Sequence, residues 1–328
     1  MVEPRQQLRE FLRPRVRFWG LTTVGGALLA ICTLAGFVGS LAWFTDVCSH
    51  FRVQYLVSLV ILSTISFIGR RTRIGTLYAV FAAINLIVIL PLYFGRQPAD
   101  RNAGPTNRAM LINVNTRHGD PVRVLKAIET YKPDIVLLEE VSEGWMKKLS
   151  ALTNDFPHHI ASPRDDNFGI AFFCRLPCDN RRIVEIGEVG VPSVMAEITS
   201  PAGRFSLLGT HPVPPAGAEY SRYRNDQLAK IPAMLAPVNG PKLILGDLNV
   251  SPWSHYFRRL LNETGLRDSG QGRGIQPTWP TGQFILRIPI DHCLHSPDIV
   301  IVGREVGPDV GSDHFPLIVD FRLGRDAP

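Results

Sequence analysis

The chain has 328 residues and a formal net charge of +6 at pH 7. This length allows a membrane region followed by one domain of about 200 residues. Residues 1–104 contain 11 Lys and Arg against 4 Asp and Glu, whereas residues 105–328 contain 24 against 25. The positive charge therefore belongs to the N-terminal third, and the near-neutral remainder argues against a protein that follows a nucleic-acid duplex along a basic surface.

The N-terminal third contains three runs almost free of charge, at about residues 19–44, 53–69 and 74–95. Each is near the length needed to cross a bilayer as a helix. A cleavable signal peptide explains the first run poorly, because its apolar region would be shorter and two further runs follow. Residues 1–95 are therefore predicted to form three transmembrane helices.

The positions of the arginines predict the orientation of this region. Five arginines precede the first run, and three more fill the loop between the second and third runs. The positive-inside rule then places the N-terminus in the cytoplasm, and three spans place the rest of the chain outside it. The chain is predicted to have a linker at 96–107 and an extracytoplasmic domain at 108–328.

The domain alternates predicted strands with predicted helices. Apolar runs followed by turn residues predict the strands, and apolar positions three and four apart predict the helices. The strands are expected within 109–115, 135–138, 168–174, 206–211, 242–245, 288–292 and 317–321, and the helices within 121–131, 218–235 and 253–261. On the second helix, Arg222 and Arg224 are expected on a solvated face, with contact to a phosphate as the alternative.

Polar residues follow several of these strands. Asp247 and Asn249 come two apart after the strand at 242–245, so in extended backbone they project to the same side. The carboxylate could ligate a divalent cation or orient a water, and the amide could donate to a phosphoryl oxygen. The alternative is a simple Asx turn.

Carboxylates and histidines follow other strands in the same way. Glu139 and Glu140 are adjacent, so only one is expected to enter a shared site, and solvent exposure of both is the alternative. His211 ends the strand at 206–211, although a lone histidine is more often structural. Asp291 precedes a histidine, and Asp313 precedes another, close to the C-terminus.

Taken in order, these segments form a series: Asn113-Val114, Leu138-Glu-Glu140, Thr210-His211, Gly246-Asp-Leu-Asn249, Ile290-Asp291 and Ser312-Asp-His314. The series, over about residues 108–323, resembles the endonuclease/exonuclease/phosphatase superfamily (DNase I-like). The resemblance implies an α+β fold, a four-layer αββα sandwich of two mixed β-sheets flanked by helices. The apolar N-terminal third resembles the membrane anchor of a bacterial subgroup related to the YafD-type proteins. This resemblance implies a bacterial inner-membrane protein whose extracytoplasmic domain is periplasmic.

The resemblance also implies roles for individual residues. The implied metal ligands are Asn113, with Asn115 as second choice, and Glu140 and Asp313. The implied catalytic residues are His211, Asp247, Asn249, Asp291 and His314. Asp291 would orient His314, and the role of general base stays open between His314 and Asp247. Glu139 stands where the family usually has Gln, and Cys174 where it usually has Ser.

The expected function is a membrane-anchored hydrolase that needs Mg²⁺ (or Mn²⁺) and cleaves a phosphodiester or a phosphomonoester. The substrate could be a nucleic acid, a lipid headgroup or a small phosphoester, although the charge of the domain does not support nucleic acid. A non-catalytic, membrane-tethered binding or scaffold protein with the same fold is the alternative. A serine hydrolase is not supported, because the Gly-x-Ser-x-Gly motif is absent. Five cysteines without Cys-x-x-Cys spacing do not predict a zinc site, and a disulfide between Cys174 and Cys178 is left open.

Overall fold

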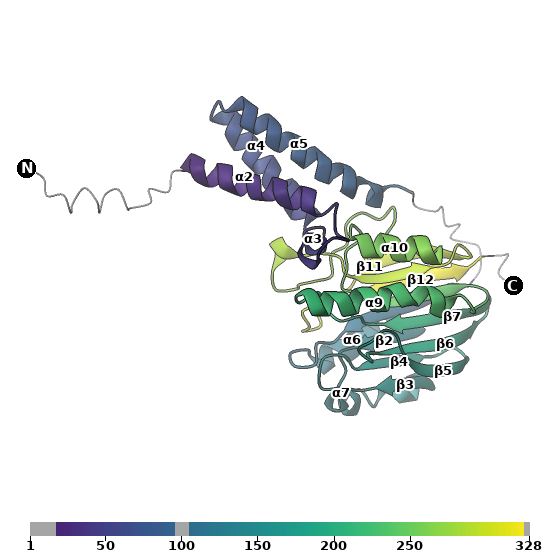
Figure 1. The fold of residues 1–328 in the computed structure, drawn as a ribbon. Helices are drawn as coiled ribbons and strands as arrows, with labels where there is room; N and C mark the ends of the chain where they lie inside the picture. The colour runs from purple at the N-terminus through teal and green to yellow at the C-terminus, as the bar shows by residue number, and fades with distance from the viewer. Residues whose placement is uncertain (1–17, 96–104, 325–328) are drawn as a thin grey trace, which may run out of the picture.

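The structure is a computed structural model that describes residues 18–95 and 105–324. A bundle of apolar helices stands on one side of a β-sandwich (Figure 1). The helices of the N-terminal part are α2 (Phe18–Ala35), α3 (Trp43–Val47), α4 (Arg52–Ile68), α5 (Thr72–Ile89) and the 3₁₀ helix η1 (Leu90–Tyr93). The arginines that precede the first run, and most of the predicted linker at 96–107, lie outside the described residues.

Helix α2 is shorter than the run 19–44 that was expected to form one span. It ends at Ala35, after which the chain turns and forms the short helix α3. The turn brings Arg52 against the end of α2, where its Nη1 donates to the carbonyl of Thr33 at 2.7 Å. A Cβ on Gly36 would lie 2.5 Å from the guanidinium of Arg52. Glycine at this position therefore lets the arginine reach the free carbonyl groups of the helix end.

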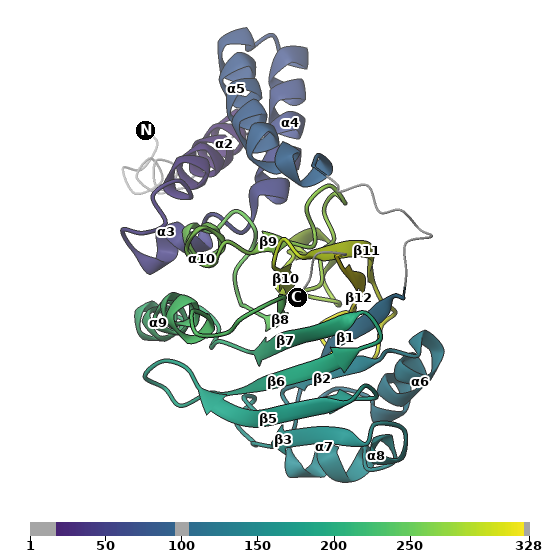
Figure 2. The same cartoon turned by 90° about the vertical axis from the view of Figure 1, so that its right-hand side faces the viewer.

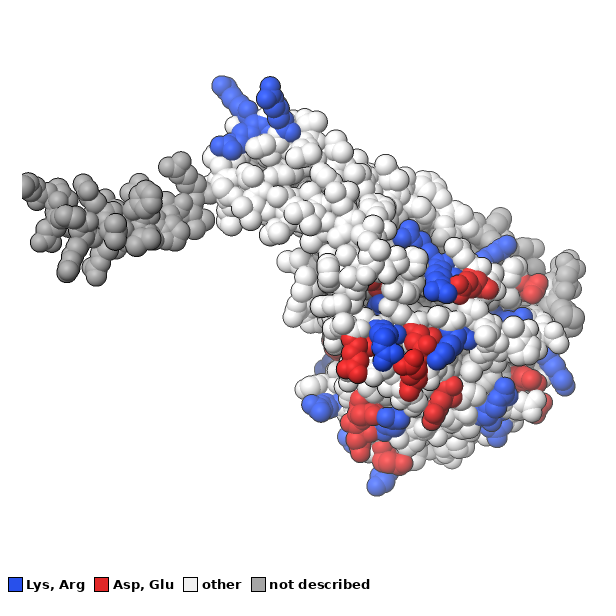
Figure 3. Space-filling model, viewed as in Figure 1, with Lys and Arg blue, Asp and Glu red and all other residues white. Residues whose placement is uncertain are grey.

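Two of the apolar helices are long enough to cross a membrane, Phe18–Ala35 and the continuous stretch Thr72–Tyr93. Helix α4, with 17 residues, is below that length. Figure 3 shows Lys and Arg side chains at the tip of the bundle, an uncharged band below them, and mixed charge over the sandwich. The described residues thus contain two candidate spans, where three were predicted.

The sandwich contains two six-stranded sheets, both with parallel and antiparallel pairs. The first has the order β11-β12-β1-β2-β4-β3, and its strands are β1 (Asn107–Asn113), β2 (Ile135–Glu139), β3 (His158–Ser162), β4 (Ile170–Cys174), β11 (Ile299–Val306) and β12 (Leu317–Leu323). The second has the order β5-β6-β7-β8-β10-β9, and its strands are β5 (Cys178–Glu185), β6 (Pro192–Ser200), β7 (Gly203–Thr210), β8 (Lys242–Asp247), β9 (Arg267–Asp268) and β10 (Asp291–His295).

Helices cover the outer face of each sheet (Figure 2). Three apolar clusters fill the interfaces, one between the sheets, one beneath α6 and α7, and one beneath α9 and α10. The helices of the sandwich are α6 (Pro121–Tyr131), α7 (Glu143–Lys148), α8 (Leu152–Asp155), α9 (Ala218–Leu235), α10 (His255–Thr264) and the 3₁₀ helix η2 (Phe284–Leu286). The predicted α+β class, with two mixed sheets flanked by helices, is confirmed.

The strand register brings the polar strand ends together. Asn113 of β1 pairs with Glu139 of the parallel strand β2, and Asp247 of β8 pairs with Asp291 of the antiparallel strand β10. Since the two sheets are stacked, both pairs lie at the same rim of the sandwich, and a site can form between them.

Two expectations about single residues differ from the structure. Arg224 does not lie on a solvated face: it is fully buried and pairs with Asp46, whereas Arg222 is exposed and pairs with Glu188. The reason is that α3 packs against α9, which a reading of α9 alone could not reveal. The five cysteines are all free, so no Cys174–Cys178 disulfide forms.

Candidate active site

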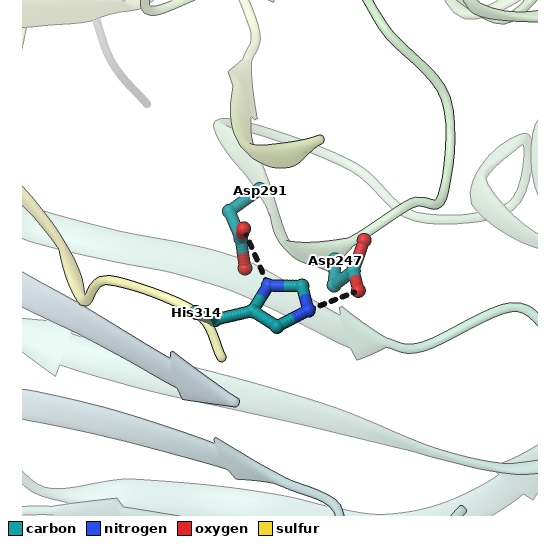
Figure 4. A group of neighbouring side chains, drawn as sticks. All are labelled: Asp247, Asp291 and His314. Atoms are coloured by element: carbon teal, nitrogen blue, oxygen red, sulfur yellow. Dashed lines mark hydrogen bonds and ion pairs between the residues drawn. The ribbon is translucent and has the colours of Figure 1, made fainter. Parts of the chain in front are cut away.

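The centre of the site is His314, which lies between two carboxylates (Figure 4). Its Nδ1 is 2.9 Å from Oδ2 of Asp291, and its Nε2 is 3.6 Å from Oδ2 of Asp247. His211 approaches the same Asp247 oxygen, at 3.6 Å from its Nε2. All four side chains are nearly fully buried, so these contacts act in a weakly screened environment.

The charges of this array follow from burial and from the order of the groups. Burial disfavours the charged ring of His314, but Asp291 and Asp247 outweigh it and raise its pKa to about 10. Burial and the nearby His314 lower the pKa of His211 to about 3. Burial raises the pKa of Asp247 well above its usual range, and His314 opposes the shift. At neutral pH the array therefore contains a cationic His314 and a neutral His211, and the carboxyl group of Asp247 is more basic than that of an ordinary aspartate.

Asp247 and Asn249 form the Asx turn that was the simpler interpretation of their spacing, and they also line the site. The backbone N–H of Asn249 donates to Oδ1 of Asp247 at 2.9 Å. Asp247 ends strand β8, but Asn249 has a φ of +52° and so leaves the extended backbone that was expected for both residues. Its side-chain amide donates to the carbonyl of Pro212, in the loop that follows His211.

The two adjacent glutamates occupy different environments. The carboxylate of Glu139 is fully buried and accepts the backbone N–H of Asp247, at 3.1 and 3.2 Å from its two oxygens. Burial, together with Asp247 and Asp291, raises the pKa of Glu139 well above its usual range. Glu140 has a φ of +61°, which ends the strand alternation and turns its side chain to the cavity. Glu139 thus joins the two sheets beneath the site, and Glu140 faces into it.

The remaining predicted ligands lie beside Glu140. Asn113 donates from Nδ2 to Oε1 of Glu140 at 2.9 Å. Asn115, the second choice, donates from Nδ2 to Oδ1 of Asp313 at 2.7 Å, and Trp279 donates from Nε1 to Oδ2 at 3.0 Å. Each asparagine therefore contacts a different predicted metal ligand: Asn113 contacts Glu140, and Asn115 contacts Asp313.

A cavity of about 530 Å³ opens onto these groups. Its polar lining includes six of the predicted residues: Glu140, His211, Asp247, Asn249, Asp313 and His314. Asp291 lies behind His314, and Asn113 behind Glu140. A larger cavity of about 640 Å³ lies beside β9 and α10, away from this cluster. The structure therefore brings all eight predicted site residues together around one cavity.

Two groups of side chains could hold a cation. Ligand atoms of Asp247, Asp291 and His314 lie within 4.8 Å of one another, but the Asp291–His314 hydrogen bond already uses Nδ1 of the ring. Glu140 offers a second carboxylate. Burial and Asp313 raise its pKa, and the hydrogen bond from Asn113 lowers it. Carboxylate and amide oxygens suit Mg²⁺ or Mn²⁺, and a cation would offset the charge repulsion. The donor set at Glu140 fits such an ion better than the histidine-containing group does.

Several residues of the cavity were not predicted from the sequence. Phe168 packs against His211 with 5.9 Å between ring centroids, and Trp279 contacts Asp313. Val47, His50 and Phe51 come from the N-terminal region. Nothing in their local sequence signals a site, because they approach it only through the packing of α3 against α9.

The sequence model of the endonuclease/exonuclease/phosphatase family matches residues 110–314. The chain belongs to this family. The match begins in β1 and ends at His314, so it spans the strand ends described above. Members of the family are generally hydrolases of phosphoester bonds, and they typically depend on a divalent metal. No match to a curated protein sequence is found.

Solved structures of the family share this fold. An endonuclease/exonuclease/phosphatase from Beutenbergia cavernae superposes with a TM-score of 0.56 at 19% identity, over 67% of this chain and 72% of that one. The catalytic domain of human nocturnin superposes with a TM-score of 0.52 at 19% identity, over 67% of this chain and 96% of that one. TDP2 from D. rerio, solved with a single-strand DNA product, superposes with a TM-score of 0.55 at 16% identity, over 67% of this chain and 100% of that one. At these identities, the likeness concerns the fold of the family domain alone.

Proposed function

We propose that this protein is a membrane-anchored phosphoesterase that uses Mg²⁺ or Mn²⁺ to hydrolyse a phosphodiester or a phosphomonoester. The observation that carries the proposal is the array His211–Asp247–His314–Asp291, which faces the same cavity as Glu140 and Asp313. Strand ends from both sheets supply these groups. A fold that served only as a scaffold would have no need for so many buried ionisable side chains in one place.

In this proposal Asp247 and His314 have separate roles in the reaction. Asp247, made basic by burial, accepts a proton from a water whose oxygen forms the new bond to phosphorus. The P–O bond to the leaving group breaks, and the leaving oxygen takes up a proton from solvent. His314, kept cationic by Asp291, stabilises the negative charge on a phosphoryl oxygen, and this assigns the role of base to Asp247.

The other predicted residues bind and orient the substrate. Asn249 and neutral His211 contact the phosphoryl group as uncharged partners, Asn249 held by the Asx turn and His211 by Phe168. Glu140, with Asn113 and Asp313 beside it, holds the divalent cation. When bound, that ion supplies charge neutralisation at the phosphoryl oxygens.

The membrane anchor is part of the same proposal. Two helices are long and apolar enough to span a bilayer. At the far end of the bundle, Arg70 and Arg71 lie between α4 and α5, and Arg73 lies in the first turn of α5. With α4 as a short third span, the positive-inside rule gives a cytoplasmic N-terminus and a periplasmic catalytic domain in a bacterial inner membrane. This arrangement is that of the YafD-type subgroup suggested by the sequence.

The test is hydrolysis by the full chain in detergent. A fluorogenic phosphodiester and a fluorogenic phosphomonoester are each incubated with Mg²⁺ and with EDTA. Asp247→Asn and His314→Gln are expected to lower kcat by about 100-fold or more. Asp309→Asn, at an exposed aspartate outside the cavity, is the matched control and should keep full activity. Activity that persists in EDTA, or in both site variants, would contradict the proposal.

A further inference from the structure

The cavity has a wall that does not come from the family domain. Val47, at the end of α3, and His50 and Phe51, in the turn between α3 and α4, line it, more than fifty residues before the family match begins. Ile288 and Ile290 of the sandwich also line it. Val47, Phe51, Ile288 and Ile290 form the apolar wall of a cavity that also contains the carboxylate and imidazole groups.

Buried polar contacts fix this wall in place. Oδ2 and Oδ1 of Asp46 accept hydrogen bonds from Arg224 and from the hydroxyl of Ser254, each at 2.7 Å. The backbone N–H of Ser251 donates to Nδ1 of His50. The turn is thus joined to the loop that follows Asp247, and its position relative to the catalytic array is set by the fold.

His50 belongs to the same buried network. It is only 3% exposed, its Nδ1 lies 2.9 Å from Oγ of Ser251, and its Nε2 lies 3.9 Å from Oδ2 of Asp46. These contacts hold the ring at the cavity wall.

A hairpin continues the apolar wall out of the cavity. Trp279 and Ile288 pair at its base and line the cavity, while η2 forms its tip. In that tip, Phe284 and Ile285 are each 79% exposed and Leu286 is 44% exposed. Three consecutive large apolar side chains on the surface mark a contact with a membrane or a partner rather than with water.

This hairpin lies beside the apolar helices. Nε2 of Gln54, in the first turn of α4, donates to the carbonyl of Arg287 directly after η2, at 2.9 Å. On the other side of the turn, Trp43 and Phe44 of α3 are 41% and 56% exposed. The hairpin tip and α3 are thus exposed apolar surfaces close to the start of α4, and the apolar wall of the cavity is built from the same two segments.

We infer that the substrate is an amphiphilic phosphoester that lies in the bilayer, that is, a lipid phosphate. Its phosphorus lies at the Asp247–His314 array, and its apolar chain follows Val47, Phe51 and Ile288 toward the membrane. The inference rests on the function proposed above and adds the substrate class. A nucleic acid, which is polar along its whole length, would leave this wall without a partner and meets a domain of near-neutral charge.

The experiment uses the full chain in nanodiscs with Mg²⁺. The substrates are phosphatidic acid and phosphatidylglycerol, each as the dioleoyl lipid and as the soluble dihexanoyl lipid, and a single-stranded DNA oligonucleotide. For at least one headgroup, kcat/KM for the dioleoyl form should exceed that for the dihexanoyl form by about 10-fold or more, because each buried methylene adds to binding.

A double substitution then tests the route from the membrane. Phe284→Asp with Ile285→Asp should lower hydrolysis of the dioleoyl lipid by about 10-fold and leave hydrolysis of the dihexanoyl lipid unchanged, since only the first is held in the bilayer. Val122→Asp is the matched control, because Val122 is 73% exposed on α6 and does not line the cavity. It should leave both activities unchanged.

The outcomes separate this inference from the proposed function. Equal rates for both chain lengths, or preferred cleavage of the oligonucleotide, would overturn the lipid substrate and leave the phosphoesterase in place. An equal loss of dioleoyl-lipid hydrolysis in the hairpin variant and in Val122→Asp would also overturn the lipid substrate. Failure to hydrolyse any phosphoester would overturn the proposed function itself.

Discussion

The guanidinium of Arg224 donates to the carboxylate of Asp46 over 2.7 Å, and both side chains are fully buried. The same guanidinium donates from Nη1 to the carbonyl of Asn249, at 3.0 Å. A residue of the N-terminal region is therefore linked through one arginine to the backbone of a predicted catalytic residue. This contact makes the N-terminal region part of the support of the active site.

Asp46→Asn is expected to destabilise the protein strongly, because it leaves the charge of Arg224 buried without its counter-ion. Breaking a buried pair in this way costs about 3–5 kcal/mol. Thermal unfolding of the full chain in detergent measures the effect. The control is Glu188→Gln, which removes the exposed partner of Arg222 and should cost about 0–1 kcal/mol. Equal shifts in the two variants would mean that Asp46 is not part of the stabilising core.

Glu139→Gln is expected to stabilise the protein increasingly as pH rises. Burial and Asp247 raise the pKa of Glu139 in the folded state, so the folded state loses stability relative to the unfolded chain above the ordinary glutamate pKa. Glutamine keeps an oxygen that can accept the N–H of Asp247 and carries no charge. The measurement is the difference in unfolding free energy between variant and wild type, from pH 4.5 to 7.5.

Glu197, on the exposed side of β6, provides the control for that series. Glu197→Gln should show no such trend with pH. A difference between Glu139→Gln and wild type that stays constant over the pH range would show that Glu139 is ionised at little cost in the folded protein.

Glu140→Gln is expected to weaken divalent-cation binding by about 10-fold or more, since it removes the carboxylate nearest to Asn113. A Mn²⁺ titration followed by electron paramagnetic resonance measures affinity without reference to turnover. Glu143→Gln, at an exposed glutamate in the first turn of α7, should bind as wild type does. If Glu140→Gln binds Mn²⁺ with unchanged affinity, the cation is held elsewhere, and the Asp247–Asp291–His314 group becomes the next candidate.

Acid is expected to destabilise the protein partly through His50. Burial lowers the pKa of His50 from 6.5 to about 4. Asp46 opposes this shift, and Arg224 and His292 add to it. The unfolded state binds the proton first as pH falls, so the contribution of neutral His50 is complete above about pH 6.5 and is lost toward pH 4. A shift of this size corresponds to about 3 kcal/mol.

The matched variant is His50→Asn, whose side-chain oxygen can still accept the N–H of Ser251 and does not titrate. Its stability should fall less steeply than that of wild type between pH 6.5 and 4, as followed by chemical denaturation. His118→Asn, at an exposed histidine, should follow the wild-type curve. Parallel curves for His50→Asn and wild type would mean that His50 takes up its proton without cost.

The sequence was informative wherever a feature is local. Apolar runs predicted β2 and β8, helical spacing predicted α6 to the residue, and the order of the polar strand ends predicted the family. Each of these depends on neighbours within a few positions, or on a pattern that the family retains along the chain. The Asx turn at Asp247 was also one of the two interpretations of the spacing between Asp247 and Asn249.

Only the tertiary structure decided which side chains meet. It placed Glu139 under Asp247, paired Arg224 with Asp46, and brought Phe51 to the same cavity as the predicted site residues. These partners are separated by 108 residues for Glu139 and Asp247 and by 178 for Arg224 and Asp46. A contact over such separations depends on how sheets and helices stack, and the local pattern of hydrophobic and polar residues carries no record of it. The chain sequence therefore determined the elements and the chemical groups, and the packing of the N-terminal helices on the sandwich determined the shape of the cavity those groups share.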